Sequence, residues 1–236
     1  MKDERLRTED PRKLLTELAI PAICAQIVTL LYNTVDRFYI GRMENGAIAM
    51  AGIGLCVPIT TVLTGLSSLF GRGGAPLAAI SLGKGDREEA EDYLGNSFMG
   101  LILFSLAVMA VGLIFLEPML ALFGASENTL PYAADYLRIY LWGTLFVQIT
   151  VGMNYFITTQ GFAKTAMVTT MLGALLNVVL DPIFMFNFHM GIAGAALATV
   201  LAQMVSCIFV LCFLLGKRTQ IRLRLKKMRL RMRPFK

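Results

Sequence analysis

Short polar links divide the chain into long apolar segments. Six of these segments are long enough to cross a bilayer as helices, which takes about 20 residues each. We expect them at about 14–40, 47–80, 93–116, 132–157, 166–187 and 191–215. The second is too long for a simple crossing, and glycines at 71, 73 and 74 interrupt its apolar run, so we expect it to tilt or to continue beyond the bilayer. The pattern predicts an all-α, polytopic membrane protein with one bundle of six helices.

Composition agrees with this fold class. The chain has 236 residues, of which 56% are hydrophobic and 16% charged, and its mean hydropathy is +0.63. A soluble domain carries about 25% charged residues. We expect three parts: a cytoplasmic segment at 1–13, the bundle at 14–215, and a basic cytoplasmic linker or tail at 216–236. A cleavable signal peptide is not expected, because the first apolar segment is too long for one.

The distribution of Lys and Arg predicts an orientation. With both termini in the cytoplasm, 18 of the 22 basic residues lie on the cytoplasmic side, ten of them in residues 217–236. Positive charge on cytoplasmic segments is the rule for cell-membrane proteins, so we expect a multi-pass protein of the inner or plasma membrane. The net charge of +6 comes from the tail, which we expect to contact anionic lipid rather than nucleic acid. Residues 222–227 are expected to lie on the membrane surface or to form a solvated linker.

Two carboxylates inside apolar segments are the strongest functional signal. Asp36 lies in the first span and Asp181 in the fifth, with Asn177 one turn before it. A carboxylate in hydrocarbon costs several kcal/mol unless it is paired, solvated or protonated, so such residues are functional by default. The pair therefore indicates a site that handles a cation.

Helical spacing places further polar groups beside these acids. Residues four apart share a helix face, so Asn177 and Asp181 lie together, as do Tyr32 and Asp36. On the sixth span Gly191, Ala195, Thr199 and Gln203 form a similar stripe. Small residues let helices approach closely, so the fifth and sixth spans are expected to bring Thr199 near Asn177 and Asp181. The resulting oxygen-rich set suits Na⁺. It also suits H⁺, because two adjacent carboxylates in a low dielectric do not both ionise comfortably.

Structural alternatives stay open for several of these residues. Asp36 would be purely structural if it paired with Arg37, although neighbouring residues on a helix diverge by about 100°. Asp181 followed by Pro182 is also a pattern that ends or bends a helix. Pro21 removes one hydrogen bond from the first helix, which produces either a static kink or a hinge.

Several stretches, in order along the chain, resemble the multidrug and toxic compound extrusion (MATE) transporters. They are Ile20-Pro21-Ala22 with Tyr32-Asn33-Thr34-Val35-Asp36, then Gly74-Ala75-Pro76 through Gly83-Lys84-Gly85-Asp86, then Asn177-Val178-Val179-Leu180-Asp181-Pro182, and Gly191-Ile192-Ala193-Gly194-Ala195-Ala196. The resemblance extends from about residue 14 to 215. It implies the N-terminal six-helix half of an antiporter that exports amphipathic, often cationic compounds against inward flow of Na⁺ or H⁺.

The resemblance also implies roles for individual residues. Asp36, Asn177, Asp181 and Thr199 would bind the cation, with a backbone contribution from Ala195. Tyr32 would join the polar network beside that site. Asn154 and Gln203 would line the drug cavity, together with methionines at 167, 171 and 185, and Pro21 would mark the helix that bends. MATE transporters have two bundles, so a C-terminal half or a second copy is an expected partner.

Two other functions remain as alternatives. A lipid-precursor flippase of the same superfamily would need a cationic cavity. Only Arg72 and Arg138 are evidence for such a cavity. A non-transporting membrane scaffold would explain the half length but not the buried acids. An enzyme is not expected, because we find no nucleophile–base pair, and the four cysteines and the single His189 lack the spacing of a metal site. No cofactor is expected besides the coupling ion.

Overall fold

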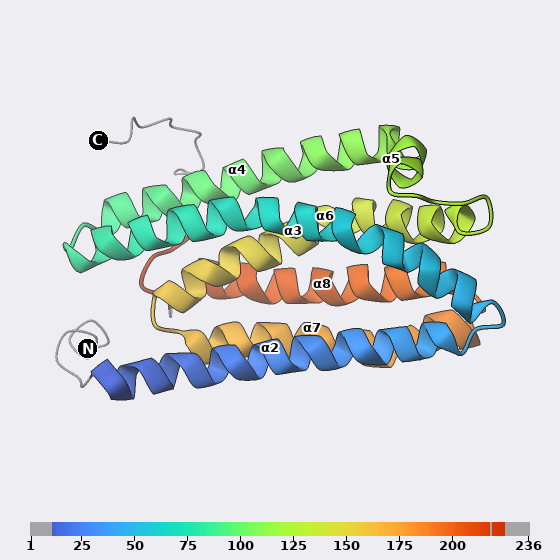
Figure 1. The fold of residues 1–236 in the computed structure, drawn as a ribbon. Helices are drawn as coiled ribbons and strands as arrows, with labels where there is room; N and C mark the ends of the chain where they lie inside the picture. The colour runs from blue at the N-terminus through green and yellow to red at the C-terminus, as the bar shows by residue number, and fades with distance from the viewer. Residues whose placement is uncertain (1–10, 218, 225–236) are drawn as a thin grey trace.

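The computed structural model describes residues 11–217 and 219–224, which form a bundle of long, roughly antiparallel helices (Figure 1). Their order is α2 (Pro11–Gly41), α3 (Gly46–Gly83), α4 (Arg87–Ile114), α5 (Leu116–Leu122), α6 (Leu130–Thr159), α7 (Ala163–Pro182), the π-helical turn η1 (Ile183–Asn187) and α8 (Ile192–Leu215). The all-α prediction is confirmed for this part of the chain. The predicted ends at residues 1–10 and 225–236 lie outside the described residues.

Five of the described helices are long and apolar enough to cross a membrane: α2, α3, α4, α7 with η1, and α8. The sequence also predicted a span at the remaining long helix, α6. This helix has 30 residues, but it is not among these five. It packs against α3, α4, α7 and α8, so most of its surface faces protein. Polar side chains in the middle of α6, such as Thr144, Gln148 and Thr150, are buried among neighbouring helices, whereas Asp135 and Arg138 nearer its start are exposed.

The second predicted span is one uninterrupted helix. Its 38 residues extend about 57 Å at 1.5 Å per residue, well beyond the roughly 30 Å hydrocarbon core. Gly71 does not break it but allows α3 to touch α6: a Cβ there would lie 2.8 Å from the carbonyl oxygen of Gly152 and 2.5 Å from the Tyr155 ring. Beside this contact, Arg72 Nε donates to Tyr155 Oη at 2.9 Å.

The link between α3 and α4 ends one helix and caps the next. Gly85 has a φ of +83°, a conformation that favours glycine, and it follows Lys84, the C-cap residue of α3. Asp86 then caps α4, because its Oδ1 accepts a hydrogen bond from the Glu89 backbone N–H at 2.9 Å. The Gly-Lys pair in this link therefore turns the chain between two helices.

The helices are not packed uniformly around the bundle. α6 is central, whereas α2 packs mainly against α7 and only lightly against α3 and α8.

We call the end with the links at 84–86 and 160–162 the tail end, because α8 finishes there. The other end carries the links at 42–45 and 188–191. Each end has its own cluster of buried apolar side chains.

The described start of the basic tail is docked on the bundle. Ile221 and Leu223 are 1% and 4% exposed and belong to the buried cluster at the tail end. The prediction of a solvated linker is therefore wrong at Leu223, whereas contact of this segment with the membrane surface stays a prediction. The two apolar side chains are covered by α4, α6 and α8, and residues 225–227 lie outside the described part.

Candidate functional site

A cavity of about 220 Å³ contains the first intramembrane carboxylate. Asp36 and Tyr32 line it from α2, and Thr199 and Gln203 line it from α8. The i, i+4 spacing on each helix explains why both members of each pair reach the same space. None of the side chains that line this space is basic. We call it the acidic cavity.

Asn177 connects the second carboxylate to this cavity. Its Nδ2 donates to Asp181 Oδ1 at 3.0 Å and to Thr199 Oγ1 at 3.2 Å. Asn177 and Asp181 are 2% and 0% exposed, so these bonds are shielded from water. The helices α7 and α8 therefore approach as the two sequence stripes predicted, and Thr199 links the Asn177–Asp181 pair to the space beside Asp36.

Three buried oxygen atoms in this set have no hydrogen-bond donor among the described residues. They are Asp36 Oδ1, Asn177 Oδ1 and Asp181 Oδ2. The link between the two carboxylates passes through Thr199, which accepts from Asn177 Nδ2 and lines the same cavity as Asp36. Buried acceptors normally have partners, so these three atoms call for a bound cation, proton or water. The described residues include no ion pair between Asp36 and Arg37.

The donor set fits a hard monovalent cation. Carboxylate, amide and hydroxyl oxygens are what such ions prefer. The described residues hold no group of three or more His, Cys, Asp or Glu of the kind that binds a transition metal. Asp36, Asn177, Asp181 and Thr199 therefore form a set that suits Na⁺ or a shared proton rather than zinc or iron.

A second, larger cavity of about 330 Å³ lies toward the tail end. Its walls come from α2, α6, α7 and α8 and carry neutral polar side chains. Tyr32 and Gln203 line both cavities. Asn154 lines only the larger one, and its Nδ2 donates to the Ala166 carbonyl at 3.3 Å. We call this space the tail-side cavity.

The other predicted residues lie around these two spaces. Ala195 is fully buried one turn before Thr199 on α8. Pro21 is inside α2, and the helix continues through it. Met185 is 3% exposed and belongs to a buried apolar cluster, so it packs in the core and lines neither of these two cavities. Met167 and Met171 are half-buried on α7 and are not among the lining residues of the tail-side cavity.

Sequence reasoning did not single out the hydroxyl groups that complete the walls. Tyr136 and Tyr140 line the acidic cavity from α6, and a threonine series lines it from α3. The signal was present, because Thr60, Thr61 and Thr64 recur at helical spacing in an otherwise apolar run. Gln26 and Thr29 similarly continue the face of Tyr32 along α2 into the tail-side cavity.

Comparison with known proteins shows similarity over most of the chain. The family model described as MatE matches residues 21–183. The multidrug export protein MepA of Staphylococcus aureus (strain MRSA252) is 27% identical over 216 residues, which make up 90% of this chain and 48% of that protein. The chain therefore spans about half the length of the curated relatives it matches.

Solved structures show the same partial match. Two crystal structures, described as MATE in the bent and in the straight conformation, align with TM-scores of 0.87 and 0.88. Each is 28% identical, and each alignment covers 96% of this chain and 50% of the other. The bundle thus has the fold of one half of these structures.

Proposed function

This chain belongs to the MatE family, and we propose that it is the N-terminal bundle of a multidrug exporter that couples export to inward movement of Na⁺ or H⁺. The protein is a multi-pass membrane protein. We place it in the cell membrane with both termini in the cytoplasm, as the distribution of Lys and Arg indicates. A C-terminal bundle or a second copy would supply the other half of the transporter.

The observation that carries this proposal is the set of three buried, unpartnered oxygens on Asp36, Asn177 and Asp181. Unsatisfied buried acceptors cost about 1–3 kcal/mol each, so a ligand that pairs with these atoms would stabilise the site. A cation would satisfy all three. Thr199 and the backbone of Ala195 would complete its oxygen ligands.

The drug would occupy the tail-side cavity, lined by neutral polar groups that include Asn154 and Gln203. Amphipathic, often cationic compounds fit a wall of amide and hydroxyl oxygens without fixed positive charge. A lipid-precursor flippase is not favoured, because the acidic cavity has no basic lining residue. The scaffold alternative is not favoured either, because it provides no binding partner for the three unpartnered oxygens.

The helix α2 would couple cation binding in the acidic cavity to drug binding in the tail-side cavity. It carries Gln26 and Thr29 into the tail-side cavity and Asp36 into the acidic cavity, and Tyr32 reaches both. Since α2 packs mainly against α7, it has few contacts with the other long helices. Cation binding at Asp36 that favours one position of α2 would therefore reshape the drug cavity, with Pro21 as the hinge.

Thermal stability of the purified chain in detergent tests the cation site. We expect Na⁺ to stabilise the chain where equal K⁺ does not, or else a pH dependence without a Na⁺ effect, and we expect Asp36→Asn to abolish the response. Asp135→Asn removes an exposed carboxylate of α6 and is the matched control. A chain that responds to neither Na⁺ nor pH would contradict the proposal.

A further inference from the structure

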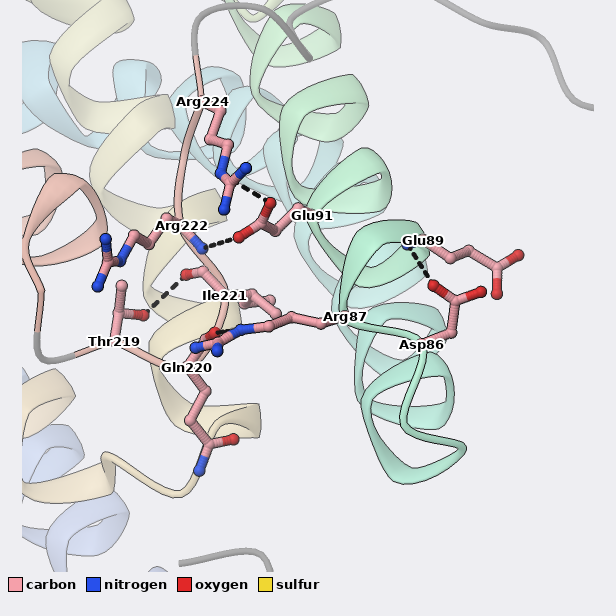
Figure 2. Close-up of polar contacts among 9 residues, drawn as sticks. All are labelled: Asp86, Arg87, Glu89, Glu91, Thr219, Gln220, Ile221, Arg222 and Arg224. Atoms are coloured by element: carbon pink, nitrogen blue, oxygen red, sulfur yellow. Dashed lines mark hydrogen bonds and ion pairs between the residues drawn. The ribbon is translucent and has the colours of Figure 1, made fainter.

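After α8 the chain turns back and crosses the tail end of the bundle as an extended segment (Figure 2). We call residues 219–224 the strap. Four consecutive backbone N–H groups of the strap donate to the bundle. Gln220 and Ile221 donate to Gln160 Oε1 at 2.9 and 3.0 Å, Arg222 donates to Glu91 Oε1 at 3.3 Å, and Leu223 donates to the Leu214 carbonyl at 3.1 Å.

Gln160, at the end of α6, is one anchor of the strap. Its Nε2 donates to the Phe156 carbonyl of its own helix at 2.8 Å, which turns the side-chain oxygen outward. That oxygen accepts three hydrogen bonds, the third from Thr219 Oγ1 at 2.6 Å. Because Gln160 is 2% exposed, water does not compete for these bonds. One amide thus fixes three successive strap residues to α6.

Glu91, in the first turns of α4, is the second anchor. Its side chain is 3% exposed, yet it accepts from the Arg222 backbone and forms an ion pair with Arg224 Nε at 3.0 Å (Figure 2). From the same helix Arg87 donates to the Gln220 carbonyl. Glu91 therefore connects the strap to α4 through one hydrogen bond and one ion pair.

The strap sequence suits this docked, extended form. Ile221 and Leu223 alternate with Arg222 and Arg224, and side chains alternate between two faces of an extended chain. The two apolar side chains are buried in the tail-end cluster, beside Leu214 of α8. The strap therefore contacts α4, α6 and α8 through both polar and apolar groups.

We propose that the strap is a clamp that holds the ends of α4, α6 and α8 together as one rigid frame. The helix α2 packs mainly on α7, outside the set of helices that the strap joins. During transport α2 would move while the clamped frame keeps the last turn of α6, and with it the tail-side cavity wall at Thr158, in place. The movement of α2 rests on the proposed function, whereas the clamp itself does not.

Hydrogen exchange on the purified chain in detergent tests the clamp. We expect the amides of residues 220–223 to exchange at least about 10-fold more slowly than in an unstructured segment, although they belong to no helix. Gln160→Leu should accelerate exchange at 220 and 221, and Glu91→Ala should accelerate it at 222, each by at least about 10-fold. Glu117→Gln, which removes an exposed carboxylate at the other end, should change nothing at the strap.

Glu91→Gln separates charge from hydrogen bonding. Its amide oxygen can still accept from the Arg222 N–H but cannot form the ion pair, so we expect partial protection at 222 and a more mobile Arg224 side chain. The clamp is overturned if residues 220–223 of the unmodified chain exchange like an unstructured segment. It is also overturned if Gln160→Leu and Glu91→Ala both leave the exchange rates unchanged.

Distances between spin labels test the rigid frame separately. In a chain whose exposed Cys24 and Cys212 are replaced by serine, labels at Lys84 and Leu215 should give one narrow distance distribution that Gln160→Leu broadens. Labels at Leu122 and Phe188, at the opposite end, should be unaffected by that change. Equal distributions in both proteins at Lys84 and Leu215 would refute the frame. Distances from a third label at Ile27 of α2 should change with Na⁺ or pH. If they do not, the proposed function is contradicted but the clamp is not.

Discussion

Replacing Asn177 with alanine should weaken the cation site in a measurable way. The change removes the two hydrogen bonds from Nδ2 to Asp181 Oδ1 and Thr199 Oγ1, and it removes one of the three unpartnered oxygens. A hydrogen bond to a charged group contributes about 1.5–3 kcal/mol. We therefore expect the free energy of ion binding to become less favourable by about 2 kcal/mol. That loss corresponds to about a 30-fold weaker site.

The assay is thermal unfolding of the purified chain at a Na⁺ concentration of about 100 times the wild-type Kd. Saturation at that level stabilises the folded chain by about 2.7 kcal/mol, whereas a site 30-fold weaker gives about 0.9 kcal/mol. For a chain of this size 1 kcal/mol shifts Tm by about 2–4 °C. We therefore expect a Na⁺-induced shift of about 5–10 °C in the wild type and about 2–4 °C in the variant.

The comparison needs a matched amide elsewhere. Asn128→Ala removes an exposed asparagine in the link before α6 and should keep the full Na⁺ shift. A full shift in Asn177→Ala would refute the reasoning, because the amide would then contribute nothing to the site. An equal shift with K⁺ would also refute it, since ionic strength rather than a bound ion would be responsible.

Three further outcomes follow from the packing and the helix ends. Gly71→Val should lower the free energy of unfolding by about 1–3 kcal/mol, because its side chain meets the Gly152 backbone, which cannot rotate away; thermal melting measures this. Asp86→Ala should cost about 1 kcal/mol through loss of the cap on α4, and exchange of the first α4 amides should reveal the fraying. N-ethylmaleimide should modify Cys24 and Cys212 quickly and the two buried cysteines only after unfolding, which mass spectrometry counts.

The sequence predicted those features that helical geometry determines locally. Positions of the long helices followed from apolar length, and the alignment of Asn177 with Asp181 followed from a spacing of four. Their approach to Thr199 also followed, because small residues mark helix surfaces that pack closely. Such contacts arise within one helix or between adjacent helices of a hairpin.

Contacts between distant segments were not predictable in the same way. Gln160 and Thr219 are 59 residues apart, and Glu91 and Arg222 are 131 apart. No periodicity connects an irregular segment to a helix end, so the tail was interpreted from its charge alone. The walls supplied by Tyr136 and Tyr140 were missed for a related reason: which face of the central helix α6 meets the acidic cavity depends on how all its neighbours pack.

The position of α6 has a consequence for how the protein enters the membrane. The buried polar side chains of α6, Thr144, Gln148 and Thr150, need neighbouring helices rather than lipid around them, so α6 depends on surfaces already present beside it. The helices α3 and α4 precede it in the chain and supply one side of its surroundings, while α7 and α8 are synthesised later. Insertion of α6 is thus a step of tertiary assembly, and a chain in which α3 or α4 is damaged should fail at biogenesis, with α6 left on the wrong side of the membrane.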